Sequence, residues 1–135
     1  MEDEFQTALF SLLSGDATLT TLGVTVSDTG PEGDGDDAEA IFPRVDLGEM
    51  DVRDDGSKDS DLWSVALMIH TFSAEPGNEE ARAIQKRLKE LLHRGSFAIT
   101  GHRLVMMRRA SSNLRRDPDG VRHGVCIFRA LVEPA

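Results

Sequence analysis

The sequence predicts an α+β fold with a mainly antiparallel β-sheet, a long β-hairpin and two main helices packed on one face. Two segments support this prediction: residues 62–73 alternate apolar and polar side chains, and residues 79–92 repeat apolar side chains at helical spacing. A charged turn at 54–61 joins residues 62–73 to a preceding stretch, 41–52, which alternates more loosely. Strands joined by hairpins and covered by helices on one face are typical of an α+β architecture.

The N-terminal part predicts a helix, a short helical turn and a brief strand. Residues 4–14 place apolar side chains one helical turn apart, and Gly15 is suited to end the helix. Asp16 is placed to cap the next turn, and residues 24–26 alternate as a short strand does. Residues 30–39 then form an acidic, glycine-rich loop with almost nothing to bury.

The helix at 79–92 is the most regular element of the sequence. Asn78 is placed to cap its start, acidic residues fall in its first turn, and basic residues gather toward its end, as the helix dipole favours. Gly95 is the expected C-cap.

The C-terminal part predicts a final hairpin. Residues 103–110 and 121–132 have the pattern of strands, and the loop expected between them, 111–120, contains an Asp-Pro-Asp-Gly turn signal. The chain has 135 residues and no internal repeat, so we expect one domain over residues 1–135. A chain of this length can bury enough surface to fold without a metal or a disulfide.

The charge of the chain is divided between its two parts. Residues 1–80 contain 20 acidic and 3 basic residues, residues 81–135 contain 4 acidic and 12 basic ones, and the resulting −17 and +8 sum to −9. Opposite patches on one molecule favour head-to-tail contacts between copies, which close into a ring or continue as a filament. The alternative is that both patches are merely solvated.

Residues used in catalysis and metal binding are present without the necessary spacing. If Gly56 occupied the sixth position of a calcium loop, Arg53 would fall at the third position and Leu62 at the twelfth, where oxygen ligands are needed. The four histidines lack zinc-site spacing, and the single cysteine, Cys126, lies in an alternating strand. We therefore expect no enzyme, metal or cofactor, and no membrane segment, because no apolar stretch approaches ~20 residues. Function is then expected to reside in surfaces.

A basic patch is the strongest surface feature of the C-terminal part. It is expected to gather four arginines around the last turn: Arg108, Arg109, Arg115 and Arg116. One interpretation is nucleic-acid binding, but no aromatic residue is interleaved for base stacking, and the net charge is negative. Protein docking fits better, because the arginines follow two methionines and both residue types are enriched at interfaces.

The order of these segments resembles the tail-terminator (tail-completion) proteins of long-tailed phages and phage-like particles, over nearly all 135 residues. The similarity starts at residues 7–23, with the leucine-rich helix and the small residues that follow it. The similarity continues through the strand 42–47, the hairpin into 63–72, the helix 79–92 and the closing strand 119–130 with its Phe-Arg ending. The acidic insertion at 30–39 departs from the family, whose members usually move more directly to the next strand.

The resemblance implies a structural virion protein that acts by assembly. Such proteins form a hexameric ring on the completed tail tube, stop its polymerisation, and present the opposite face to the head-closure (stopper) protein. DNA passes through the ring without specific binding, which an acidic lumen would assist by repelling phosphates. The expected place is the virion tail at the head–tail junction, after assembly in the host cytoplasm. Free subunits can still be monomeric, because charge-dominated contacts are weak and screened by salt.

Two sets of acidic residues are candidates for this assembly. Asp54, Asp55, Asp59 and Asp61 join the four arginines as candidate interface residues. Glu32, Asp34, Asp36, Asp37 and Glu39 are candidates for the lumen or the tube face. Both acidic loops are expected to be mobile in the free subunit, since like charges repel and glycine is costly to order. The alternative functions are another connector, either a stopper or a tube subunit, or a small bacterial enzyme or regulator.

Overall fold

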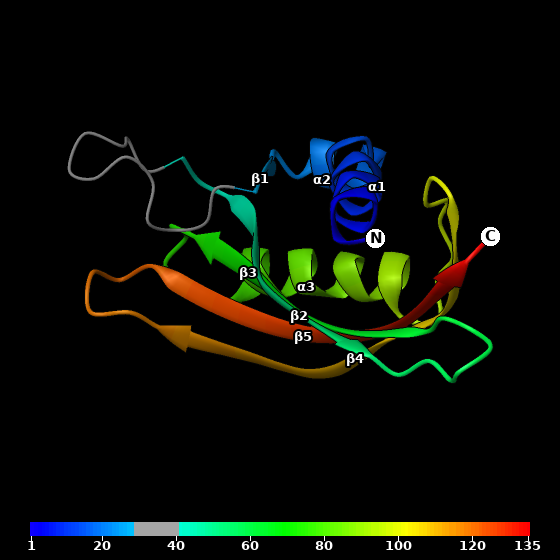
Figure 1. The fold of residues 1–135 in the computed structure, drawn as a ribbon. Helices are drawn as coiled ribbons and strands as arrows, with labels where there is room; N and C mark the ends of the chain where they lie inside the picture. Colours follow the sequence, from blue (N-terminus) through cyan, green and yellow to red (C-terminus); the bar gives the residue numbers. More distant parts are fainter. Residues whose placement is uncertain (29–40) are drawn as a thin grey trace.

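A five-stranded sheet carries the helices of the protein on one of its faces (Figure 1). The computed structural model describes residues 1–28 and 41–135. The helices are α1 (Glu2–Ser14), α2 (Ala17–Thr21) and α3 (Glu79–Leu92). The strands are β1 (Thr25–Ser27), β2 (Arg44–Asp54), β3 (Trp63–Ser73), β4 (His102–Arg116) and β5 (Arg122–Pro134). Their order in the sheet is β1-β2-β3-β5-β4; β1 pairs with β2 in parallel, and the other pairs are antiparallel. The predicted α+β fold is confirmed.

The hydrophobic core lies between the sheet and the two long helices. One stripe of α1 is buried through Phe5, Leu9 and Leu13, which are spaced by four residues and therefore share a face. In α3 the corresponding buried apolar residues are Ala81, Ile84, Leu88 and Leu92. Both stripes belong to the same buried cluster as alternate residues of β3 and β5: Val65, Leu67, Ile69, Cys126, Phe128, Ala130 and Val132. The predicted packing of the apolar side chains of 79–92 and of one face of 62–73 is therefore confirmed.

A charged pair ties α2 to α3. The Asp16 side chain accepts a hydrogen bond from Leu19 N–H at 3.0 Å, which confirms the predicted cap. The same carboxylate accepts two bonds from the Arg87 guanidinium, at 3.0 and 2.7 Å. These bonds from Arg87 are the main reason that the pKa of Asp16 lies below its usual value.

The ends of α3 differ from the expected caps. Asn78 occupies the N-cap position, but its side chain accepts a bond from Arg122 at 2.8 Å instead of capping the helix. The C-cap is His93, so the expected cap at Gly95 is wrong by two positions. Arg94 takes the left-handed conformation in place of a glycine, with φ of 60°, and its N–H donates to Met107 O of β4 at 2.7 Å. Gly95 is required for space, because a Cβ there would lie 2.2 Å from Leu91 O.

β4 is longer than the sequence predicts. It continues to Arg116, so the expected loop at 111–120 is wrong, and the connection shrinks to the Asp-Pro-Asp-Gly turn. β4 lies at the edge of the sheet, so the polar residues 111–113 satisfy strand pairing with β5 and still remain exposed. Two register shifts, at 104/106 and 109/111, interrupt its pairing and change which side chains share a face.

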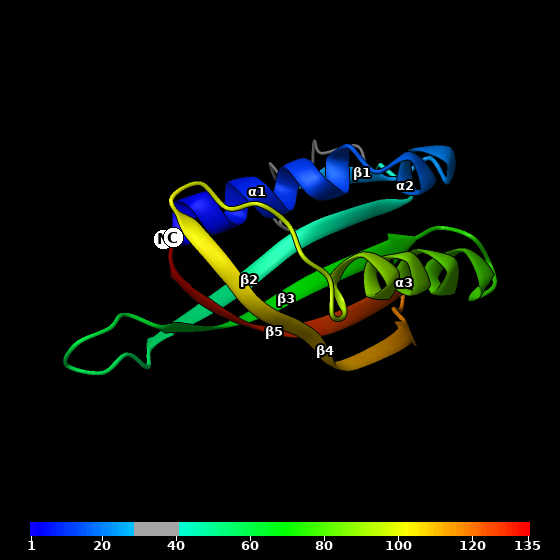
Figure 2. The ribbon, with the colours of Figure 1, turned by 90° about the vertical axis from the view of Figure 1, so that its right-hand side faces the viewer.

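The face opposite the helices, called here the open face, carries alternate residues of the same strands. Ala66, Met68 and His70 of β3 point to this face and are half-buried. The sheet is twisted and the β2–β3 hairpin extends beyond the body of the molecule (Figure 2). The open face therefore joins the protruding hairpin to the basic strand β4.

Candidate functional site

The predicted acidic turn is the outermost part of the β2–β3 hairpin (Figure 2). Backbone bonds from Asp55 to Leu62 (2.8 Å) and from Ser57 to Ser60 (2.9 Å) close residues 54–61, called here the acidic tip. All residues of the tip are exposed. Within the described chain, no basic side chain is in ion-pair distance of its four aspartates. The tip thus presents uncompensated negative charge, while its mobility in the free subunit stays a prediction.

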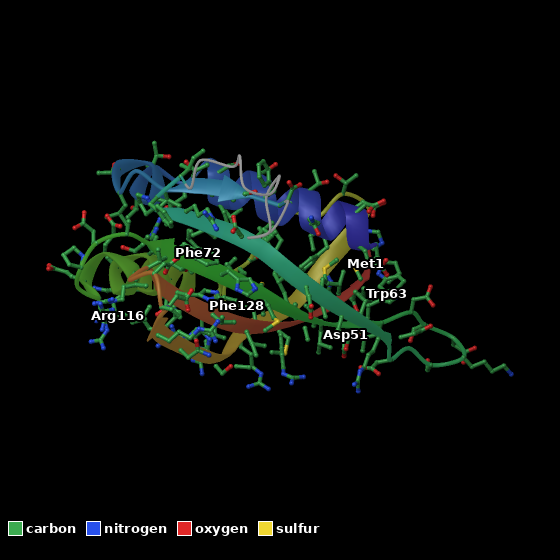
Figure 3. The ribbon with its side chains drawn as sticks, turned by 90° about the vertical axis from the view of Figure 1, so that its left-hand side faces the viewer. Met1, Asp51, Trp63, Phe72, Arg116 and Phe128 are labelled. Carbon is green, nitrogen blue, oxygen red and sulfur yellow. The ribbon has the colours of Figure 1, made fainter. Side chains whose placement is uncertain are left out.

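The four predicted arginines do not cluster around one turn. All four lie on β4, and Arg108 and Arg115 are separated by seven residues, or about 23 Å of extended strand. Neighbouring residues of a strand point to opposite faces, which separates Arg108 on the open face from Arg109 on the helix-covered side. Arg115 and Arg116 lie at the far end of the sheet from Asp51 and the hairpin (Figure 3). The predicted single patch is therefore wrong, because the loop that would have gathered it is strand.

A pair of opposed arginines on the open face was missed by the sequence analysis. Arg108 of β4 and Arg129 of β5 are directly opposite each other in the ladder, and both are exposed. Like charges in this position destabilise a strand pair. No carboxylate of the described residues lies within ion-pair distance of either guanidinium. The register with its two shifts creates this pair, so the sequence pattern alone gave no signal for it.

The opposed arginines line a depression of about 530 Å³ on the open face. Its opposite wall comes from β2 and the start of the tip, with Asp51 and Asp55. Met106 and Leu131 supply apolar surface next to the arginines. Arg53 also lines the β2 side and lies 3.6 Å from Asp51, so the β2 side holds two acids and one base, whereas the side of β4 and β5 is basic.

The outer edge of β4 is partly protected by the end of α3. Arg94 N–H bonds to Met107 O, His93 Nδ1 accepts from Arg109 N–H at 3.0 Å, and Gln85 Nε2 donates to Asn113 O at 2.8 Å. Capped backbone groups cannot pair with another strand. Next to these caps a groove of about 550 Å³ exposes Val105 and Met106, which are 44% and 38% exposed. This edge is better suited to side-chain docking than to strand addition.

A polar chain crosses the open face at the end far from the tip. Arg115 Nη2 lies 3.1 Å from His123 Nδ1, and His123 Nε2 lies 2.9 Å from His70 Nδ1. Arginine only donates, so the bond from Arg115 requires His123 Nδ1 to accept, and His123 Nε2–H then donates to His70 Nδ1. Asp117 Oδ2 also lies 3.6 Å from His123 Nδ1 and opposes the lowering of the His123 pKa. The pKa of each histidine is lowered, mainly by burial, because the charged form loses hydration. His123 also stacks on Phe72, with ring centroids 4.4 Å apart.

The described residues offer little for catalysis or metal binding. Cys126 is fully buried, and burial raises the pKa of its thiol, which disfavours the reactive thiolate. Within residues 1–28 and 41–135 no three or more histidine, cysteine or acidic side chains are placed to hold a metal ion. None of the helices in these ranges has the length and hydropathy of a transmembrane segment. The candidate lumen acids Glu32, Asp34, Asp36, Asp37 and Glu39 lie outside the described residues.

Comparison with known proteins identifies the family. The sequence model of the family described as "Tail completion protein gp17" matches residues 7–133, which is nearly the whole chain. The protein belongs to this tail-completion family. The resemblance inferred from the order of its segments is therefore confirmed. A search of curated proteins found no match.

A solved structure agrees with the tail-completion assignment. The fold is similar to a chain in the "Virion of native gene transfer agent (GTA) particle", with a TM-score of 0.80 and 26% identity. The alignment covers 95% of this chain and 93% of the other. Family and structure together support a structural role in a virion tail, and they favour a structural protein over an enzyme.

Proposed function

We propose that this tail-completion protein forms a ring, hexameric by resemblance to its family, that caps the completed tail tube and joins it to the head-closure protein. The family match over residues 7–133 carries the proposal, because it covers most of α1 and β5 and all of the other helices and strands. The similarity to a chain of a virion particle supports the same role.

The distribution of charge supports a ring. A head-to-tail contact needs two different surfaces that complement each other. The acidic tip lies at one end of the sheet and Arg115 and Arg116 lie at the other, as the positions of Asp51 and Arg116 show (Figure 3). Such a molecule attracts further copies in one orientation and repels them in the opposite one.

The lumen of the ring has a separate requirement. DNA must pass through it, and phosphates bind to basic surfaces. The acidic segment with Glu32, Asp34, Asp36, Asp37 and Glu39 is the candidate for lining the channel or touching the tube. Its acids would reduce DNA binding by repulsion, which leaves DNA free to pass.

The test is electron microscopy of particles produced without this protein. We expect tails of uncontrolled length that fail to join heads, because nothing stops tube polymerisation or offers a surface to the head. Supplying the wild-type protein should restore tails of uniform length and joined particles. Normal joined particles in its absence would contradict the proposal. Missing tails would instead point to a tube subunit, and finished tails on leaking heads to a stopper.

A further inference from the structure

Two surfaces of this protein carry charges that their own chain does not neutralise. The acidic tip has four aspartates around one exposed turn, with Lys58 as its only basic residue. The open-face depression has Arg108 and Arg129 on one wall, and on the other Asp51, which is paired with Arg53 at 3.6 Å. In the described chain neither the tip aspartates nor these two arginines form an ion pair.

The opposed arginines have the properties of a carboxylate-binding site. Arg108 and Arg129 face each other across β4 and β5, and their mutual repulsion weakens the strand pair. A carboxylate between two guanidinium groups would remove this repulsion and accept charge-assisted hydrogen bonds from both. Met106 beside them adds apolar surface, and arginine with methionine is typical of protein interfaces.

From these observations we propose that the acidic tip of one copy docks in the open-face depression of the next copy. The inference deepens the proposed ring and rests on it. Asp59 meets Arg108 and Arg129 of the neighbour, which have no ion-pair partner among the described residues of their own chain. The negative charge of the tip thus complements the arginine wall of the depression.

The shape of the molecule supports a second copy as the occupant. The tip extends beyond the body (Figure 2), so it can reach a neighbour without displacing any element of its own fold. When each tip enters the depression of the next copy, the contact is heterologous, and repeated contacts close into a ring or continue. The capped edge of β4 disfavours strand addition there, since Met107 O and Arg109 N–H are already bonded.

A charge-exchange experiment tests this contact. Variant one carries Asp59→Arg, and variant two carries Arg108→Asp and Arg129→Asp. Each variant alone opposes like charges, so we expect its ring yield on tails to fall by about tenfold or more. Mixed in one assembly reaction, the two variants form matched contacts in alternation, and rings should return. Matched controls are Glu75→Arg and Arg82→Asp, which reverse exposed charges away from both surfaces and should assemble normally.

The readout is multimer size by sedimentation at low salt, together with electron microscopy of tail ends. Unchanged assembly of either variant would overturn the contact. Loss without recovery on mixing would also overturn it, and would assign the tip to another partner. If the wild-type protein forms rings and ends tails normally, but mixing the two variants does not restore rings, the proposed contact is wrong while the proposed function stands. If the wild-type protein forms no ring even on tails, the proposed function is wrong, and the proposed contact is then wrong as well.

Discussion

At the scale of single residues, the histidine chain on the open face makes stability depend on pH. His123 and His70 are held in neutral forms, because Arg115 donates toward one ring nitrogen and burial disfavours charge. Their pKa values are lowered from the usual 6.5, so the unfolded chain binds protons more readily than the folded one. Stability is therefore fully present above about pH 6.5 and falls as the pH decreases through that value.

We expect urea midpoints to decrease from pH 7.5 to pH 5.5, and to decrease less in a His70→Gln, His123→Gln variant. Chemical unfolding followed by fluorescence of Trp63 measures both. The control is His102→Gln, a half-buried histidine outside this chain of contacts, which should keep the wild-type dependence. An equal pH dependence in the double variant and the wild type would contradict the account.

A second prediction at this scale concerns the close approach of α3 to β5. A Cβ on Gly124 would lie 2.3 Å from Gln85 Nε2, which bonds Asn113 O. Gly124→Ala should displace that amide and leave the Asn113 carbonyl without its bond, at a cost of about 1–3 kcal/mol in unfolding free energy. Gly77→Ala is the control, because a Cβ there would meet nothing within 4 Å. Equal stabilities of the two variants, measured by urea unfolding, would contradict this explanation.

At the scale of elements, α3 and β3 were predictable because one periodicity extends through each of them. The apolar stripe of α3 and the apolar face of β3 both lie in one buried cluster. The first half of β4 was predicted as the strand 103–110, but its continuation to Arg116 was not, because its polar residues 111–113 and the turn signal suggested a loop. Its strand conformation depends on pairing with β5 and on the Gln85 bond to Asn113, which are contacts distant in sequence.

The same reason limits what could be predicted of the candidate site. The acidic tip is a local feature of the sequence and was located correctly at the hairpin turn. The juxtaposition of Arg108 and Arg129 depends on a register with two shifts, and each shift changes the face of the following side chains. The sequence pattern therefore shows where charges lie along the chain, but it does not show which charges meet across neighbouring strands.

The packing of α3 gives a prediction for stability at this scale. Leu88 is fully buried against the sheet, so Leu88→Ala should remove packing and leave a cavity, at about 2–5 kcal/mol. Lys86→Ala, on the exposed side of the same helix, should change stability by less than about 0.5 kcal/mol. Urea unfolding at pH 7.5 measures both. A loss below 1 kcal/mol for the leucine variant, as a surface position would give, would contradict its place in the core.

At the scale of the whole molecule, the acidic segment should act on DNA passage and not on folding. Converting Glu32, Asp34, Asp36, Asp37 and Glu39 to Gln or Asn removes five negative charges from a segment with almost nothing to bury. We expect normal folding of the subunit, but impaired tail joining or slower DNA release. The measurement is particle yield together with the rate of DNA delivery. Full DNA delivery after this change would show that these acids are only solvated surface.

The account as a whole rests on where the protein sits in the particle. A small epitope tag attached after the exposed residue Ala135, imaged with gold-labelled antibody, locates it directly. The proposed function predicts one cluster of label per particle, at the end of the tail tube where it meets the head. Label spaced along the whole tube, or confined to the far end of the tail, would contradict the central claim that this protein caps the completed tube and joins it to the head.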